Sequence, residues 1–128
     1  MPKEAIATDK APAAVGPYSQ AIKTGQWIFL SGQIPIDPAT NQVTLGPIEQ
    51  QTELVLKNAQ RVLEAAGASL SHVVKATLFL ANMEDYPRVN GMYARFFPYD
   101  PPARSAVQVA RLPKDVGIEI EMIAFLDE

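Results

Sequence analysis

Alternating apolar and polar residues predict that much of this chain forms β-strands. Residues 18–33 contain two extended runs, and Thr24 and Gly25 between them suit a hairpin turn. The same two-residue period predicts further strands near residues 3–7 and at residues 72–80, 103–109 and 117–125. Strands are therefore expected at both ends of the chain as well as in its middle.

Two other segments repeat apolar residues at the spacing of a helix. The first extends from Pro47, a residue type favoured in a first helical turn, to Gly67, a residue type that commonly ends one. The second extends from about Tyr86 to Phe97. Between the second strand and the first helix, two prolines and Asn41 predict a loop of about a dozen residues.

The order ββαβαββ is typical of an α+β fold in which two helices pack on one face of a mixed sheet. We interpret residues 1–128 as one domain, because a chain of this length buries enough surface to fold alone. The helix between residues 72–80 and 103–109 suits a right-handed crossover between parallel strands.

The strands are apolar on both faces. Trp27 and Phe29 point to one side of their strand, while Ile28 and Leu30 point to the other. Strands with this pattern have both faces covered, and two helices cover only one. The second face is therefore expected to be buried by curling of the sheet or by another copy of the chain, and we favour a homo-oligomer.

Composition narrows the classes of function. The net charge is −3 with no run of Lys or Arg, so binding to nucleic acid has little electrostatic support. The absence of cysteine excludes disulfides, thiolate metal sites and a cysteine nucleophile. No signal peptide is recognisable, and no apolar run approaches the roughly 20 residues that cross a bilayer. We expect a soluble cytoplasmic protein without membrane contact.

Three polar residues interrupt apolar patterns: Arg104, Glu119 and Asn90. Taken singly, each position favours an ordinary role, namely a solvated strand end, a charge on the wetter sheet face, and a capping or packing amide. His72 is the only histidine and is expected at the surface or in a cap. One histidine, with no HExxH motif and no carboxylate cluster at ligand spacing, predicts no metal site. No phosphate loop or nucleophile elbow is present.

Several segments together change this interpretation. They read GPYSQAI (16–22), FLSGQIP (29–35), VVKATLFLANMEDYPRVNGMYARFF (73–97) and PARSAVQVARLPKDVGIEIEMIA (102–124). In order and spacing they resemble the Rid family, the reactive intermediate deaminases, also called YjgF-type proteins. The resemblance is closest to the imine deaminase subgroup, RidA, which is marked by an arginine where Arg104 stands.

This resemblance implies a chorismate-mutase-like fold assembled as a homotrimer, with a barrel-like core of sheets and clefts between subunits. It implies hydrolysis of reactive 2-imino acids, such as 2-iminopropanoate and 2-iminobutanoate, to 2-oxo acids and ammonia, without a cofactor or metal. It implies that Arg104 binds the substrate carboxylate and that Glu119 holds or activates the water that attacks C2 of the imine. The residues that it implies in the cleft are Tyr18, Ser31, Gly32, Asn90, Arg104 and backbone groups at Ala106.

One departure concerns Ala106, because many relatives carry cysteine at this position. Imine hydrolysis needs an electrophilic carbon, an anchored carboxylate and a directed water, so activity is expected without the thiol. Two alternatives to the enzyme stay open. One is a module that binds or senses small carboxylates such as 2-oxo acids without turnover. The other is the RNA cleavage or chaperone-like behaviour ascribed to some relatives, which the negative net charge disfavours.

Overall fold

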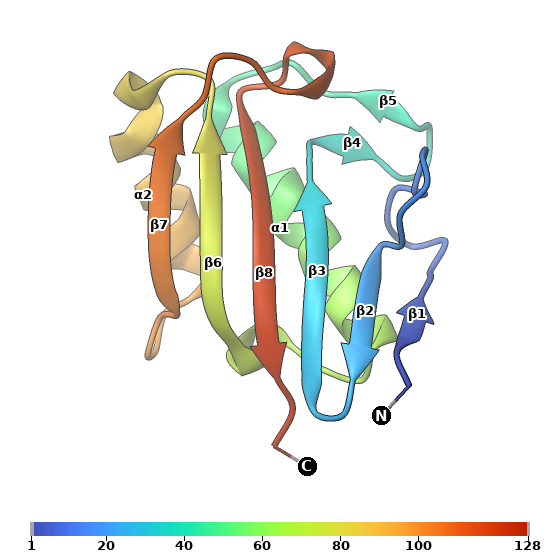
Figure 1. The fold of residues 1–128 in the computed structure, drawn as a ribbon. Helices are drawn as coiled ribbons and strands as arrows, with labels where there is room; N and C mark the ends of the chain where they lie inside the picture. Colours follow the sequence, from blue (N-terminus) through green and yellow to red (C-terminus); the bar gives the residue numbers. More distant parts are fainter. Residues whose placement is uncertain (1, 128) are drawn as a thin grey trace.

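The computed structural model describes residues 2–127 as one six-stranded sheet, a two-stranded sheet and two α-helices (Figure 1). The helices are α1 (Ile48–Ala65) and α2 (Tyr86–Phe96). The strands are β1 (Glu4–Ile6), β2 (Ala21–Thr24), β3 (Trp27–Gln33), β4 (Ile36–Asp37), β5 (Gln42–Val43), β6 (Val73–Leu80), β7 (Ala103–Gln108) and β8 (Ile118–Phe125). Every strand and helix expected from the sequence is present.

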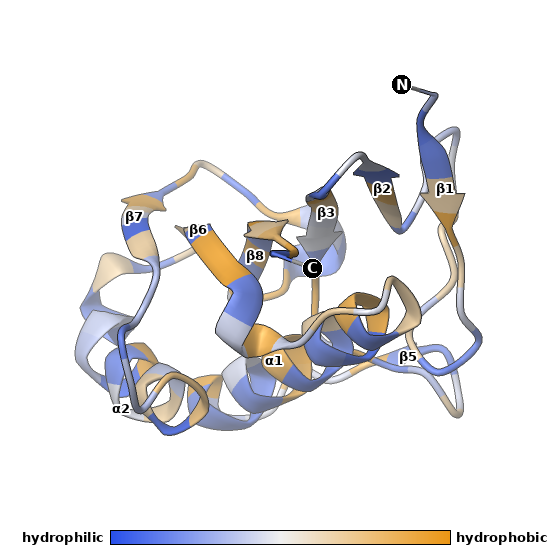
Figure 2. Cartoon of the chain, turned by 90° about the horizontal axis from the view of Figure 1, so that it is seen from below, coloured by the Kyte–Doolittle hydropathy of each residue, from blue (hydrophilic) through white to orange (hydrophobic). Residues whose placement is uncertain are grey.

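The main sheet has the strand order β1-β2-β3-β8-β6-β7, which is mixed as expected. Only β6 and β7 pair in parallel, and α2 connects them. All other neighbouring strands are antiparallel. Both helices lie on the same side of the sheet (Figure 2). The α+β prediction with two helices on one face is therefore confirmed.

Helix α1 forms the centre of the core. Its apolar positions recur at helical spacing, and Val55, Leu56, Ala59, Val62 and Leu63 are fully buried. Burial of each Val or Leu side chain contributes about 1.5–3 kcal/mol, so this stripe is a main source of stability. The positive φ of 87° at the glycine after α1, Gly67, explains why the helix stops at that point.

The segment between β3 and α1 is more ordered than the predicted loop. Strands β4 and β5 pair there as a small hairpin whose turn contains Asn41 at a φ of 60°. The buried amide of Asn58 on α1 donates a hydrogen bond of 2.8 Å to the carbonyl of Ile36. Two-residue strands give no readable alternation, so the sequence pattern could not predict this hairpin.

The face of the sheet opposite the helices exposes apolar side chains. Trp27, Phe29 and Val107 keep 44%, 43% and 43% of their surface accessible, while Ile28 and Leu30 on the helix side are buried. No element among residues 2–127 covers this open face in Figure 2. The prediction that the strands are apolar on both faces is confirmed.

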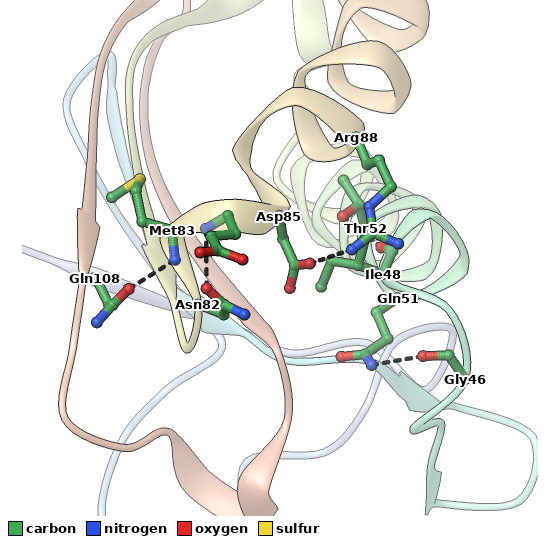
Figure 3. Close-up of polar contacts among 10 residues, drawn as sticks. Gly46, Ile48, Gln51, Thr52, Asn82, Met83, Asp85, Arg88 and Gln108 are labelled. Carbon is green, nitrogen blue, oxygen red and sulfur yellow. Dashed lines mark hydrogen bonds and ion pairs between the residues drawn. The ribbon is translucent and has the colours of Figure 1, made fainter.

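Polar contacts join the start of α2 to the end of β7 (Figure 3). The side chain of Gln108 accepts a hydrogen bond of 2.7 Å from the backbone N–H of Met83, just before α2. Asn82 accepts a 2.9 Å bond from the N–H of Glu84, and Arg88 pairs with Asp85. These contacts fix α2 against β7, the two elements that carry Asn90 and Arg104.

None of the helices among residues 2–127 is long and apolar enough to cross a membrane.

Candidate active site

Arg104 is half-buried on β7 and points toward α2. Its Nη2 donates two hydrogen bonds of 2.8 Å, one to the hydroxyl of Tyr86 and one to Oδ1 of Asn90. Both partners are uncharged. Because the contacts on α2 come from positions four residues apart, they share one face of that helix. Arg104 and Asn90, which the resemblance places in one cleft, are therefore in direct contact in the structure.

Two aromatic rings also contact this guanidinium. The Cζ atom of Arg104 lies 4.8 Å from the ring centroid of Tyr93 and 5.5 Å from that of Tyr86, distances typical of cation–π contacts. Burial raises the pKa of Tyr93, and the positive charge of Arg104 offsets part of that rise. A cavity of about 350 Å³, which we call the arginine pocket, adjoins the cation. Its lining residues are Asn90, Tyr93, Ala94, Phe97, Pro101, Pro102 and Arg104.

Arg104 has no acidic partner within the described chain. The ion pairs among residues 2–127 are Lys57–Glu53, His72–Asp127, Arg88–Asp85 and Arg111–Asp115. A guanidinium has five N–H donors, and the two on Nη2 are engaged. The donors on Nε and Nη1 have no partner among residues 2–127. The arrangement is an immobilised cation ready to receive an anion.

Glu119 lies in a second cavity, at the start of β8. This cavity of about 240 Å³, which we call the glutamate pocket, is also lined by Tyr18, Gly32 and Lys114. Burial raises the pKa of the Glu119 carboxyl, and the nearby negative charge of Glu121 raises it further. A carboxyl with a raised pKa is suited to exchange protons near neutral pH.

The backbone of Gly32 touches the carboxylate of Glu119. A Cβ atom at position 32 would lie 2.0 Å from Oε2 of Glu119, a distance that no real side chain tolerates. The pairing of β3 with β8 also shifts register between Leu30 and Gln33, so a bulge brings this glycine to the acid. The glycine of the SGQ sequence therefore leaves the space that the Glu119 carboxylate occupies, and a larger residue at this position would force that flexible side chain to move.

Ser31 and Ala106 lie beside the two pockets without lining them. The Ser31 hydroxyl donates a 2.6 Å bond to the carbonyl of Ser19, and its N–H donates a 3.0 Å bond to the carbonyl of Gln20. Ser31 thus stabilises the bulge next to Gly32. Ala106 is half-buried and packs against the core from the same face of β7 as Arg104.

One chain does not bring Arg104 and Glu119 together. Across the sheet, Arg104 is in register with Ala76 and Met122 on the helix side, whereas Glu119 is on the open face. The two residues are two strands apart across the sheet and three residues apart along the strands, which is roughly 10 Å in each of these directions. The predicted residues thus form two half-sites: Arg104 with Asn90, and Glu119 with Tyr18 and Gly32.

Some site residues were not identified from the sequence. Tyr86 and Tyr93 lie in the segment predicted as the second helix, and no motif marks them as site residues, although their spacing around Asn90 places all three on one face. Lys114 has a φ of 56° and Asp115 one of 58°, in the left-handed region. No residue type in LPKD indicates this conformation, which carries Lys114 to the rim of the glutamate pocket.

His72 has the capping role expected of it. Its Nδ1 accepts a 3.0 Å hydrogen bond from the N–H of Ser69 at the turn before β6. Within residues 2–127, no three His, Asp or Glu side chains cluster as metal ligands.

The fold and the two pockets define a class of protein, a small α+β protein whose single chain carries a cationic pocket at Arg104 and a separate acidic pocket at Glu119. A sequence profile of the family described as Endoribonuclease L-PSP matches residues 8–126. Two relatives at more than 40% identity are named as deaminases, one of them as a reactive intermediate deaminase. The chain therefore belongs to this family, the Rid family, and the resemblance found in the sequence is confirmed.

Three relatives show the extent of the similarity. Reactive Intermediate Deaminase A, chloroplastic, of Arabidopsis thaliana is 52% identical over 124 residues, covering 97% of this chain and 66% of that protein. The 2-iminobutanoate/2-iminopropanoate deaminase of Dermatophagoides farinae is 43% identical over 126 residues, covering 98% of each. The crystal structure of E. coli TdcF with bound serine has a TM-score of 0.92 and 42% identity, covering 95% of this chain and 98% of that chain.

The contact at Gly32 leads to a first prediction. In Gly32→Ala the new methyl group displaces the Glu119 carboxylate, and we expect kcat for the imine hydrolysis that the family resemblance implies to fall by about 10- to 100-fold, as for a misplaced catalytic group. The matched control is Gly91→Ala on the exposed face of α2, where an added Cβ meets no atom within 4 Å. That control should raise the thermal midpoint slightly and leave kcat unchanged. Equal kcat values for Gly32→Ala and wild type would show that the contact is irrelevant.

Proposed function

We propose that this protein is a hydrolytic deaminase of 2-imino acids, with 2-iminopropanoate and 2-iminobutanoate as substrates. The observation that carries the proposal is the half-buried guanidinium of Arg104, held by neutral groups and without a carboxylate partner in the described chain. Such a cation suits a small carboxylate ligand. The names of the relatives from Arabidopsis thaliana and Dermatophagoides farinae support the same reaction class.

The reaction uses each half-site for one task. The substrate carboxylate binds the free donors of Arg104, which fixes the position of C2. Glu119 accepts a proton from a water molecule as the water oxygen bonds to C2, and the C=N π electrons move to nitrogen. Glu119 returns this proton to the nitrogen, which leaves a hydroxyl and an amino group on C2. Glu119 then accepts the hydroxyl proton and transfers it to the amino nitrogen. The C–N bond breaks with its electron pair on nitrogen, and neutral ammonia leaves as the C2 oxygen becomes the carbonyl of a 2-oxo acid. Every proton is accounted for by water, substrate and this one carboxyl group.

The side chain at position 106 takes no part in this scheme. Alanine has no nucleophile, and the attacking oxygen comes from water. In the proposed cleft, backbone groups near Ala106, together with Ser31 and the neighbouring bulge, complete the lining.

The two half-sites meet between copies of the chain. Arg104 and Glu119 lie on different faces of one sheet, so only a neighbouring chain can bring a second half-site to each. The open face offers Trp27, Phe29 and Val107 for burial against that neighbour. A closed ring gives every chain the same two neighbours. We propose a homotrimer, the assembly that the family resemblance implies, with a barrel-like core of sheets.

A mixing experiment tests the shared site. Arg104→Ala and Glu119→Gln homo-oligomers are each expected to be inactive, but unfolding and refolding an equimolar mixture produces some sites with both native residues. Random assembly of a cyclic oligomer predicts about 25% of wild-type activity. The double variant Arg104→Ala/Glu119→Gln mixed with an equal amount of wild type is the control: shared sites predict about 25% of the activity of pure wild type after refolding, whereas sites within one chain predict about 50%. No recovery in mixed oligomers of confirmed composition would place the site within one chain.

A coupled assay tests the function itself. A serine or threonine dehydratase generates the imine, and the release of ammonia or 2-oxo acid is followed with and without this protein. We expect faster hydrolysis with the wild-type chain. The alternative is a sensor of small carboxylates, a reading supported by the serine bound in the structure of E. coli TdcF. Tight binding of 2-oxobutanoate without faster hydrolysis would favour the sensor.

A further inference from the structure

The aromatic residues around Arg104 have separate tasks. We infer that Tyr93 positions Arg104 through the face of its ring, while Tyr86 positions it through its hydroxyl oxygen. Both are positioning residues for the reaction proposed above, on which this inference rests, and neither needs to touch the substrate. Together they hold the guanidinium in one orientation before the carboxylate arrives.

Tyr93 contacts the guanidinium of Arg104 through its ring. The side chain is 5% exposed, and its ring centroid lies 4.8 Å from Cζ of Arg104. A second ring, Phe97, packs against it with centroids 4.7 Å apart. The Tyr93 hydroxyl is buried and has no hydrogen-bond partner among residues 2–127. The ring therefore contacts the cation and is itself packed against a second ring, whereas the hydroxyl has no hydrogen-bond partner among residues 2–127 through which it could orient Arg104.

Tyr86 is engaged in the opposite way. Its ring centroid is farther from Cζ of Arg104, at 5.5 Å, but its hydroxyl accepts a hydrogen bond of 2.8 Å from Nη2. Asn90 accepts the other hydrogen of the same nitrogen at 2.8 Å. Two acceptors on one Nη2 fix the plane of the guanidinium, and a ring against that group restricts its remaining freedom. A cation fixed in advance loses less conformational entropy on binding a carboxylate.

Single-atom and whole-ring substitutions separate these tasks. Tyr93→Phe keeps the ring and is expected to have kcat/KM within about 2-fold of wild type, with an equal or higher thermal midpoint. Tyr93→Leu removes the ring, and Tyr86→Phe removes the acceptor. We expect each of these two variants to lose about 10-fold in kcat/KM and in affinity for 2-oxobutanoate. Val62→Ala, a buried change in α1, which contributes no residue to the arginine pocket, controls for lost stability and should keep wild-type kcat/KM.

NMR provides a readout that needs no turnover. A guanidinium over an aromatic ring shows upfield ring-current shifts of the Arg104 Hδ protons, and slow rotation gives separate Nη signals. Both features are expected in wild type and Tyr93→Phe. In Tyr93→Leu the upfield shift should fall to the smaller value that the Tyr86 ring, 5.5 Å from Cζ, still produces, and the Nη signals should exchange faster. An undiminished upfield shift in Tyr93→Leu would overturn the inferred role of the ring.

Activity and binding decide the remaining outcomes. If Tyr93→Leu keeps wild-type kcat/KM, Tyr93 does not position Arg104. If Tyr93→Phe loses as much kcat/KM as Tyr93→Leu, the hydroxyl of Tyr93, and not its ring, has the positioning role. If the wild-type protein fails to hydrolyse imines, the proposed function fails. The positioning role is then judged separately by the affinity for 2-oxobutanoate and by the NMR signals. Unchanged affinity in both Tyr93→Leu and Tyr86→Phe would reject it.

Discussion

Arg104→Ala is expected to lower kcat/KM for 2-iminopropanoate by about 1,000-fold, equivalent to roughly 4 kcal/mol of lost transition-state stabilisation. The variant removes the one cation that anchors the substrate carboxylate, and it also leaves Asn90 and Tyr86 without their shared donor. Steady-state kinetics in the coupled assay measure the loss. Analytical ultracentrifugation should show that the variant has the same oligomeric state as the wild-type protein.

Arg104→Lys distinguishes charge from geometry. Lysine keeps the positive charge but replaces the planar five-donor group with a single ammonium, and we expect about a 100-fold loss of kcat/KM. The matched control is Arg95→Ala, which removes an exposed arginine from the last turn of α2. Its kinetics should equal those of the wild type. Parental rates in Arg104→Ala would remove the basis of the proposed function.

Glu119→Gln is expected to lower kcat by about 100- to 10,000-fold while the affinity for 2-oxobutanoate stays near wild type. Glutamine keeps the shape of the side chain and cannot accept the proton of the attacking water. Isothermal titration measures binding, and single-turnover kinetics measure the chemical step. A loss of affinity that accounts for the whole loss of kcat/KM would contradict the proton-accepting role.

The pH dependence provides a second test of Glu119. A general base acts in its deprotonated form, so kcat declines as the pH falls through the pKa of that carboxyl. Burial and Glu121 raise this pKa above the ordinary 4.5, which moves the decline to higher pH. Glu121→Gln removes the second cause, and the acidic limb of the profile should shift to lower pH. An unmoved limb in Glu121→Gln would show that another group controls it.

The same carboxyl affects stability with a definite sign. Because its pKa is raised by folding, the folded state binds the proton more tightly, and wild-type stability falls as the pH rises through that pKa. Glu119→Gln lacks this ionisation and should have a higher thermal midpoint at neutral pH. Lost activity together with gained stability is typical of a residue kept for function.

The sequence predicted the fold well where elements are long. The helical stripe of α1, the flanking Pro47 and Gly67, and the alternation in β3 and β8 determined those elements, since many residues repeat one pattern. The hairpin of β4 and β5 was missed, because it depends on the distant amide of Asn58.

The candidate site was predictable only as a set of residues. Periodicity placed Arg104 and Asn90 on elements that meet, but the resemblance supplied their roles. Neither the periodicity nor the resemblance showed that Arg104 and Glu119 lie on opposite faces of the sheet within one chain. That arrangement depends on how β7 and β8 are each paired with β6, and the pairing register is a long-range property. The left-handed backbone at Lys114 and Asp115 was equally hidden, since both residue types adopt other conformations in most loops.

The separation of Arg104 and Glu119 has a genetic consequence. In the proposed ring, every subunit lends its cation to one neighbour and its acid to the other. A mutant allele that alters one of these residues spoils one centre per defective chain, whereas an allele that alters both spoils two. Cells carrying a normal and a doubly altered copy should therefore lose more than half of their activity, a dominant effect that an enzyme with self-contained protomers does not show.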